Sequence, residues 1–129
     1  VPKWVRTPCQ PISISDAIAY LVGVLDAEET RGGIYDIGAP TVWSYESLLK
    51  LTAEQKGKRV LILPVPVMSP SLSSHWLRLT TDVQYAIARP LVESMRNPVT
   101  VDPERDLQSV VPIEQTSVET AVQRALADG

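Results

Sequence analysis

The stretch that decides the fold is residues 11–26, PISISDAIAYLVGVLD. Its polar start offers Ser15 as a helix N-cap, with Asp16 suited to the positive end of the helix dipole. Large apolar residues then recur at the i, i+3, i+4, i+7 spacing of one buried helix face: Ile18, Leu21, Val22 and Leu25. Three more residues widen that face: Ala17, Tyr20 and Val24. The pattern predicts a largely covered helix over residues 16–27.

Short apolar runs on either side of this helix predict strands. Prolines at positions 2, 8 and 11 bias the N-terminal residues toward an extended arm, with strand pieces at residues 4–7 and 11–14. Further along, residues 34–37 (IYDI) and 99–102 (VTVD) predict short strands, and residues 60–63 (VLIL) predict a strand buried on both faces.

Capping signals predict the remaining helices. Ser44 is the N-cap of a helix that Gly57 ends, and Pro90 kinks or restarts a later helix. Three further helix starts are expected, at Ser69-Pro70, at the Thr81-x-x-Gln84 capping box and at the Thr116-x-x-Glu119 capping box. The alternation predicts an α/β fold with a partial, mixed or parallel sheet of about three to four strands and about five helices.

The 129 residues suffice for one domain, residues 1–129, and their composition excludes several functions. Lys plus Arg number 12 and Asp plus Glu number 15, a net charge of −3 that provides no electrostatic footprint for nucleic acid. One Cys and one His exclude a disulfide framework and argue against a zinc site. No apolar run reaches the roughly 20 residues of a membrane span, and no signal peptide is evident, so a cytoplasmic location is expected.

Motifs that would hold a cofactor or a metal are missing. Gly32-Gly33 precedes a predicted strand instead of following one, and Gly38-Ala39-Pro40 lacks the later glycines of a dinucleotide loop. We therefore expect no cofactor in this part of the protein. Three acidic residues alternate like ligands of a hard cation, but they fit a solvated turn better than a calcium loop: Asp102, Glu104 and Asp106.

The segment over residues 64–96 holds the candidate site. His75 next to Ser74, or paired with Cys9, suggests nucleophilic catalysis, but no G-x-S-x-G elbow surrounds the serine and nothing indicates an activated thiolate. A small-molecule pocket, apolar with a few fixed polar groups, is the better interpretation. Its candidate residues are His75, Trp76, Tyr85 and Arg89. The alternative is that Trp76 is a core residue and Arg89 a surface cation.

Several motifs together resemble a known family. Residues 11–17 (PISISDA) resemble the Pro-Ile-x-Val-x-Asp-Val segment of extended and atypical short-chain dehydrogenases, the epimerase-like and NmrA-like group. Residues 33–38 (GIYDIG) are similar to that group's Gly-x-Tyr-Asn-Ile-Gly strand, and Ser44-Tyr45 with Leu48 to its next helix start. Residues 89–97 (RPLVESMRN) are similar to a run in bacterial nucleoside-diphosphate-sugar epimerase-like, NAD(P)-binding members.

The resemblance implies the C-terminal lobe of a Rossmann-type protein, whose upstream half binds NAD(P) and bears a glycine-rich loop and often a Tyr-x-x-x-Lys pair. Neither occurs here, since Tyr85 is followed four residues on by Arg89, and Tyr45 five residues on by Lys50. Ser13 and Ser15 also stand where many members have His and Asp. In the family this lobe binds substrate and closes over the nicotinamide, and some members are redox sensors or assembly factors rather than enzymes.

We therefore expect a substrate-binding lobe that is inactive by itself, within an NAD(P)-dependent epimerase, dehydratase or reductase. The start at Val1 without Met suggests a piece of a longer chain. The alternatives are a stand-alone interaction or dimerisation module and a redox-sensor regulatory domain. Loss of the other half would expose apolar surface at residues 60–63 and on the Ile18/Leu21/Leu25 face, so self-association of the fragment is expected.

Overall fold

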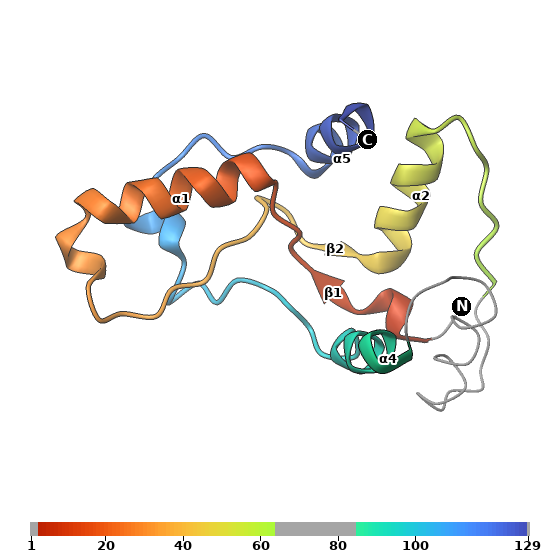
Figure 1. Ribbon diagram of the computed structural model, residues 1–129, viewed down its shortest axis with the longest axis horizontal. Helices are drawn as coiled ribbons and strands as arrows, with labels where there is room; N and C mark the ends of the chain where they lie inside the picture. The colour runs from red at the N-terminus through yellow and green to blue at the C-terminus, as the bar shows by residue number, and fades with distance from the viewer. Residues whose placement is uncertain (1–2, 64–84, 129) are drawn as a thin grey trace. The chain divides into compact units, whose positions relative to one another are not determined.

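The computed structural model describes residues 3–63 and 85–128 (Figure 1). The chain forms two compact units. The first comprises Val1–Pro8 and Ser44–Pro98, and the second comprises Cys9–Trp43 and Val99–Gly129. The described residues hold four α-helices and one two-stranded sheet, so the mixed α/β class is confirmed and the sheet is smaller than predicted.

In the second unit, helix α1 (Ile14–Asp26) confirms the predicted helix but not its cap (Figure 1). The predicted N-cap, Ser15, is wrong, because Ser13 caps the helix and its Oγ accepts a hydrogen bond from the backbone N–H of Asp16 at 3.1 Å. Ser13 has extended backbone and lies three residues before Asp16, the spacing at which a serine hydroxyl reaches a free helix N–H. The strand predicted at residues 11–14 is wrong because the helix already begins at Ile14.

The buried face of α1 is not the predicted one. Tyr20 is 2% exposed and forms the core of the second unit with Leu107 and Val111. The four residues of the predicted face, Ile18, Leu21, Val22 and Leu25, are between 53% and 78% exposed. The helix turns this way because Asp16 and Tyr20, on the opposite face, have hydrogen-bonding partners in the C-terminal segment.

The strands predicted in the second unit are reduced to single bridges. Asp36 forms an isolated parallel bridge with Asp106. The short 3₁₀ helix η2 (Glu28–Thr30) precedes Asp36 in the chain, and the 3₁₀ helix η3 (Leu107–Ser109) follows Asp106. Val99 likewise pairs only with Cys9. A strand needs a neighbour along its length, and the described residues provide none for residues 34–37 or 99–102.

Helix α5 (Val118–Ala127) confirms the last predicted helix with a shifted cap. The N-cap is Ser117, whose Oγ accepts a hydrogen bond from the backbone N–H of Thr120 at 3.2 Å. Thr116, the predicted cap, is wrong because its backbone N–H and its hydroxyl both bind the carboxylate of Asp16.

In the first unit, the 3₁₀ helix η1 (Lys3–Arg6) replaces the strand predicted at residues 4–7. The reason is packing: Val5 is buried, and the ring of Trp4 meets that of Tyr45 edge-on. Strand β1 (Pro8–Cys9) follows at the point where the chain passes into the second unit, and it pairs with β2 (Trp43–Ser44), where the chain returns to the first.

Helix α2 (Tyr45–Gln55) confirms both of its predicted ends. Ser44 caps it in a reciprocal pair of hydrogen bonds with Ser47, and Gly57 has a φ of 67°, the left-handed conformation that ends a helix. The strand predicted over residues 60–63 is wrong: these residues have no regular structure, and Leu61 is 83% exposed. No strand among the described residues lies beside this run, so its backbone has no ladder to join.

Helix α4 (Tyr85–Ser94) contains Pro90 within one continuous helix. Three predictions lie outside the described residues: the extended run at residues 64–67, the Ser69-Pro70 helix start and the Thr81-x-x-Gln84 capping box.

Candidate functional site

The predicted pocket falls largely outside the described residues. His75 and Trp76 belong to the segment that the structure does not describe, as does Ser74. Tyr85 and Arg89 lie on α4, one turn apart, but their side chains are not described. The pocket therefore stays a prediction.

Cys9 is poorly suited to nucleophilic catalysis. It is buried, and burial raises the pKa of its thiol. Only the thiolate is a good nucleophile, so this environment keeps Cys9 in the unreactive form at neutral pH. The structure thereby favours the interpretation of Cys9 as a structural thiol.

The acidic residues of the 102–106 segment form caps and ion pairs rather than a metal site. Asp102 accepts a hydrogen bond from the backbone of Glu104 at 3.0 Å and pairs with Arg105 at 3.5 Å. Asp36 accepts a hydrogen bond from the backbone of Asp102 at 3.0 Å and pairs with Arg105 at 3.7 Å. Within residues 3–63 and 85–128 no group of three metal-ligating side chains comes together.

The densest polar network in the second unit surrounds Tyr20. Its hydroxyl donates to Oε1 of Gln108 at 2.6 Å and accepts from Nε2 of Gln115 at 3.1 Å. Gln108 also binds both backbone groups of Ile113, and Gln115 donates to the carbonyl of Gly38. Burial raises the pKa of Tyr20, so the hydroxyl stays neutral. Because these groups satisfy one another, the network holds the C-terminal segment on α1.

Asp16 is the one charged residue that is buried among those the structure describes, at 4% exposure. Its carboxylate accepts hydrogen bonds from the backbone N–H of Thr116 at 2.6 Å and from the Thr116 hydroxyl at 2.7 Å. Burial alone would raise the pKa of Asp16, but the hydrogen bonds from Thr116 and Ser13 and the positive charge of Arg124 together lower it. Asp16 thus stays ionised and ties the start of α1 to the residue before the cap of α5.

The sequence provided no signal for this contact. Asp16 was identified only as a partner of the helix dipole, and Thr116 lies 100 residues away. The role of Gln108 and Gln115 was missed for the same reason, since their partner, Tyr20, is 88 and 95 residues distant.

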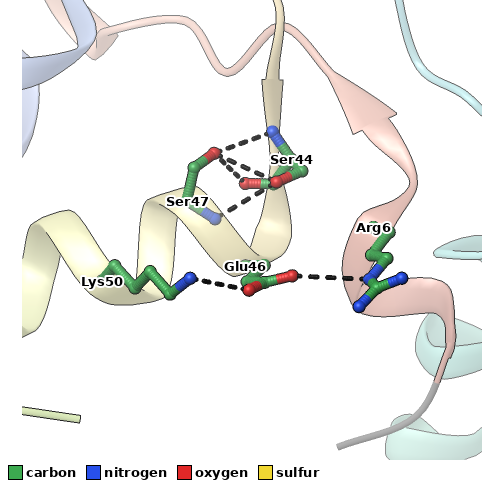
Figure 2. Close-up of polar contacts among 5 residues, drawn as sticks. All are labelled: Arg6, Ser44, Glu46, Ser47 and Lys50. Carbon is green, nitrogen blue, oxygen red and sulfur yellow. Dashed lines mark hydrogen bonds and ion pairs between the residues drawn. The ribbon is translucent and has the colours of Figure 1, made fainter. Parts of the chain in front are cut away.

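In the first unit, a cluster of charged groups links η1 to α2 (Figure 2). Glu46 accepts a hydrogen bond from Nζ of Lys50 at 2.7 Å and pairs with Nε of Arg6 at 3.7 Å. The hydrogen bond from Lys50 lowers the pKa of Glu46, with the charges of Lys50 and Arg6 acting in the same direction. A carboxylate held ionised between two cations is a weak base, so the contacts of Glu46 fit a structural role in linking η1 to α2.

Exposed apolar side chains are the most unusual feature of the described surface. Five of them lie on α1: Ile14, Ile18, Leu21, Val22 and Leu25. Others lie on residues 60–63 and on α4. Among the described residues, no helix is both long enough and apolar enough to span a membrane.

No family model matches this chain. No curated protein matches it either. Two solved structures of the Citrobacter sp. triphenylmethane reductase, however, share its fold. The structure of the complex with NADP(H) matches with a TM-score of 0.75 and 17% sequence identity over 97% of this chain. The second matches with a TM-score of 0.74 and 17% identity over 98% of this chain.

In both comparisons this chain spans 44% of the reductase, less than half of its length. With a TM-score of 0.75 at 17% identity, the comparison shows likeness of fold alone. The predicted relation to part of an NAD(P)-binding reductase is thereby supported at the level of the fold.

Proposed function

We propose that this chain is the substrate-binding lobe of a cytoplasmic NAD(P)-dependent reductase- or epimerase-like protein. One observation carries the proposal. The fold shared with a reductase that was crystallised with NADP(H) covers 97% of this chain but only 44% of the reductase. The sequence adds that no dinucleotide loop is present in these residues. The glycine-rich loop, and with it the NAD(P) site, would then lie in an upstream half of the same protein.

The substrate would be held by the residues over 64–96. Trp76 and Tyr85 provide flat aromatic surfaces, Arg89 a permanent positive charge, and His75 a group that can donate or accept a proton. None of them forms the Tyr-x-x-x-Lys pair of a catalytic centre, so we assign this lobe binding and orientation of the substrate. Because the reductase with the shared fold acts on triphenylmethane dyes, such a dye is the first ligand to test.

Binding of NADPH tests whether the NAD(P) site lies in the upstream half. We expect the protein extended to its upstream half to bind NADPH with a Kd in the micromolar range or below, by calorimetry. We expect the 129-residue chain to show no such binding. Micromolar binding to the chain alone would overturn the proposal, and so would the absence of binding to the extended protein.

Steady-state kinetics of the extended protein tests the pocket. Trp76→Ala and Arg89→Ala should each raise the KM for a triphenylmethane dye about tenfold and leave the Kd of NADPH unchanged. A tenfold rise corresponds to the loss of about 1.4 kcal/mol of binding free energy, that of one contact. Arg31→Ala is the matched control, because the Arg31 side chain is exposed and pairs with the equally exposed Glu28 at 3.6 Å. If the KM of Trp76→Ala and Arg89→Ala equals that of the wild type and of Arg31→Ala, these two residues do not belong to the pocket.

The second candidate, an interaction or dimerisation module, is favoured by the exposed apolar residues of α1. It predicts that the chain self-associates, which light scattering over a range of concentrations would measure. A redox-sensor role would have to act through the cofactor of the other half, since the sole cysteine is buried and its pKa is raised. A sensor would bind NADPH without turnover of any substrate.

A further inference from the structure

Helix α1 is apolar on two opposite faces. One face carries Tyr20, with Val24 and Ala27 packed against the core of the second unit. The other, which we call the outer face, consists of Ile14, Ile18, Leu21, Val22 and Leu25, each between 53% and 78% exposed. These positions follow the i, i+4, i+7, i+8, i+11 spacing of a continuous stripe.

The composition of α1 is that of a helix covered on both sides. Its thirteen residues include two charged side chains, Asp16 and Asp26, and no Lys or Arg. Asp16 is buried on the other side of the helix, where its carboxylate accepts hydrogen bonds from Thr116. The stripe of the outer face therefore contains no charged residue. A helix that is apolar all round is typical of a protein interior, and a contiguous apolar surface of this kind marks an interface.

The fold indicates what covers the outer face. In α/β proteins a helix that precedes a strand packs on the face of a parallel sheet, because its apolar stripe is buried there. The segment after α1, residues 34–37, has the composition of such a strand, and its Ile34 is 77% exposed. The matching reductase is more than twice as long as this chain, since 44% of it is covered here. The fold therefore occurs with enough additional chain to form that sheet.

We infer that the outer face of α1 is the surface on which the nucleotide-binding half of the same protein packs, through one apolar face of its parallel sheet. This inference rests on the proposed function, because it requires that half to exist. A second copy of the chain would meet the same apolar requirement. The partial coverage of the reductase favours the half, because in that protein the additional chain belongs to the same polypeptide as the shared fold.

Thiol labelling of the extended protein tests the packing. In a Cys9→Ser background, Leu21→Cys or Leu25→Cys introduces one thiol on the outer face, and Glu28→Cys introduces one at an exposed polar position just after α1. We expect maleimide to label the native Leu21→Cys and Leu25→Cys proteins at least tenfold more slowly than Glu28→Cys. In urea all three should react at the same rate.

Labelling of Leu21→Cys and Leu25→Cys as fast as Glu28→Cys in the native protein would overturn the inference. Protection that disappears on dilution would also overturn it, because the cover would then be a second copy. Two positions are used so that one badly folded variant does not decide the result. The Kd of NADPH is measured on the same samples, so that NADPH binding with an unprotected outer face refutes the packing alone, and absent NADPH binding refutes the proposed function.

Discussion

Replacement of Asp16 by Asn should destabilise the second unit by about 2 kcal/mol at neutral pH. The carboxylate accepts two hydrogen bonds from Thr116, at 2.6 and 2.7 Å. Hydrogen bonds to a charged group contribute about 1.5–3 kcal/mol each. The amide keeps one acceptor and turns an N–H₂ group toward a donor, so about one of the two bonds is lost.

For a chain of this size, 1 kcal/mol corresponds to a shift in Tm of about 3–5 °C. We therefore expect the Asp16→Asn variant to unfold about 6–10 °C below the wild type, measured by circular dichroism at neutral pH. Thr116→Val should cost about half as much, because it removes the hydroxyl and keeps the backbone N–H. Asp26→Asn, on the exposed end of the same helix, is the matched control and should unfold like the wild type.

The pH dependence follows from the direction of the pKa shift. The folded state lowers the pKa of Asp16 below its ordinary value, which is about 3.9 in an unfolded chain. The ionised form is thus favoured by folding, and its contribution is complete above about pH 5 and is lost as the pH falls through the folded pKa. The difference between the wild type and Asp16→Asn should stay constant from about pH 5 to 8 and shrink below about pH 4. Equal Tm values at pH 7, or a difference that does not change in acid, would refute the reasoning.

Three further substitutions have defined outcomes in the same unfolding assay. Tyr20→Phe should cost about 1–2 kcal/mol, because it leaves Oε1 of Gln108 without its 2.6 Å donor. Gly23→Ala should cost about 1 kcal/mol net. A Cβ at this position meets the side chain of Val111, and this overpacking costs about 2 kcal/mol. The higher helix propensity of alanine offsets about 1 kcal/mol of that cost. Gly57→Ala should cost about 1 kcal/mol, since Gly57 has a φ of 67° and open space around it, so that only backbone strain opposes the change. A stabilised Gly23→Ala protein, or unchanged Tyr20→Phe and Gly57→Ala proteins, would contradict these assignments one by one.

The features that the sequence predicted well depend on contacts between residues close in the chain. Ser44 and Gly57 delimit α2 because a cap and a left-handed residue act within one helical turn. Helices α1 and α5 occur where their periodicity places them, whereas the restart that was one of the two outcomes predicted at Pro90 does not occur, because α4 continues through it. The resemblance to dehydrogenase motifs led to the class of fold that the reductase structures share.

The strands and the buried faces required the tertiary structure. A run such as residues 60–63 becomes a strand only beside a neighbour, and its sequence carries no information on whether one is present. The candidate pocket residues His75, Trp76, Tyr85 and Arg89 remain predictions, because their side chains lie outside the described residues.

By itself, the sequence over residues 11–26 determined that a helix forms there and that it is apolar on more than one side. Only the tertiary structure decided which side faces the core. The choice depends on Asp16 and Tyr20, whose polar atoms meet Thr116 and Gln108 from the far end of the chain. An apolar face can be buried on several surfaces, but a buried carboxylate or hydroxyl must meet its hydrogen-bonding partners, and these are 100 and 88 residues away.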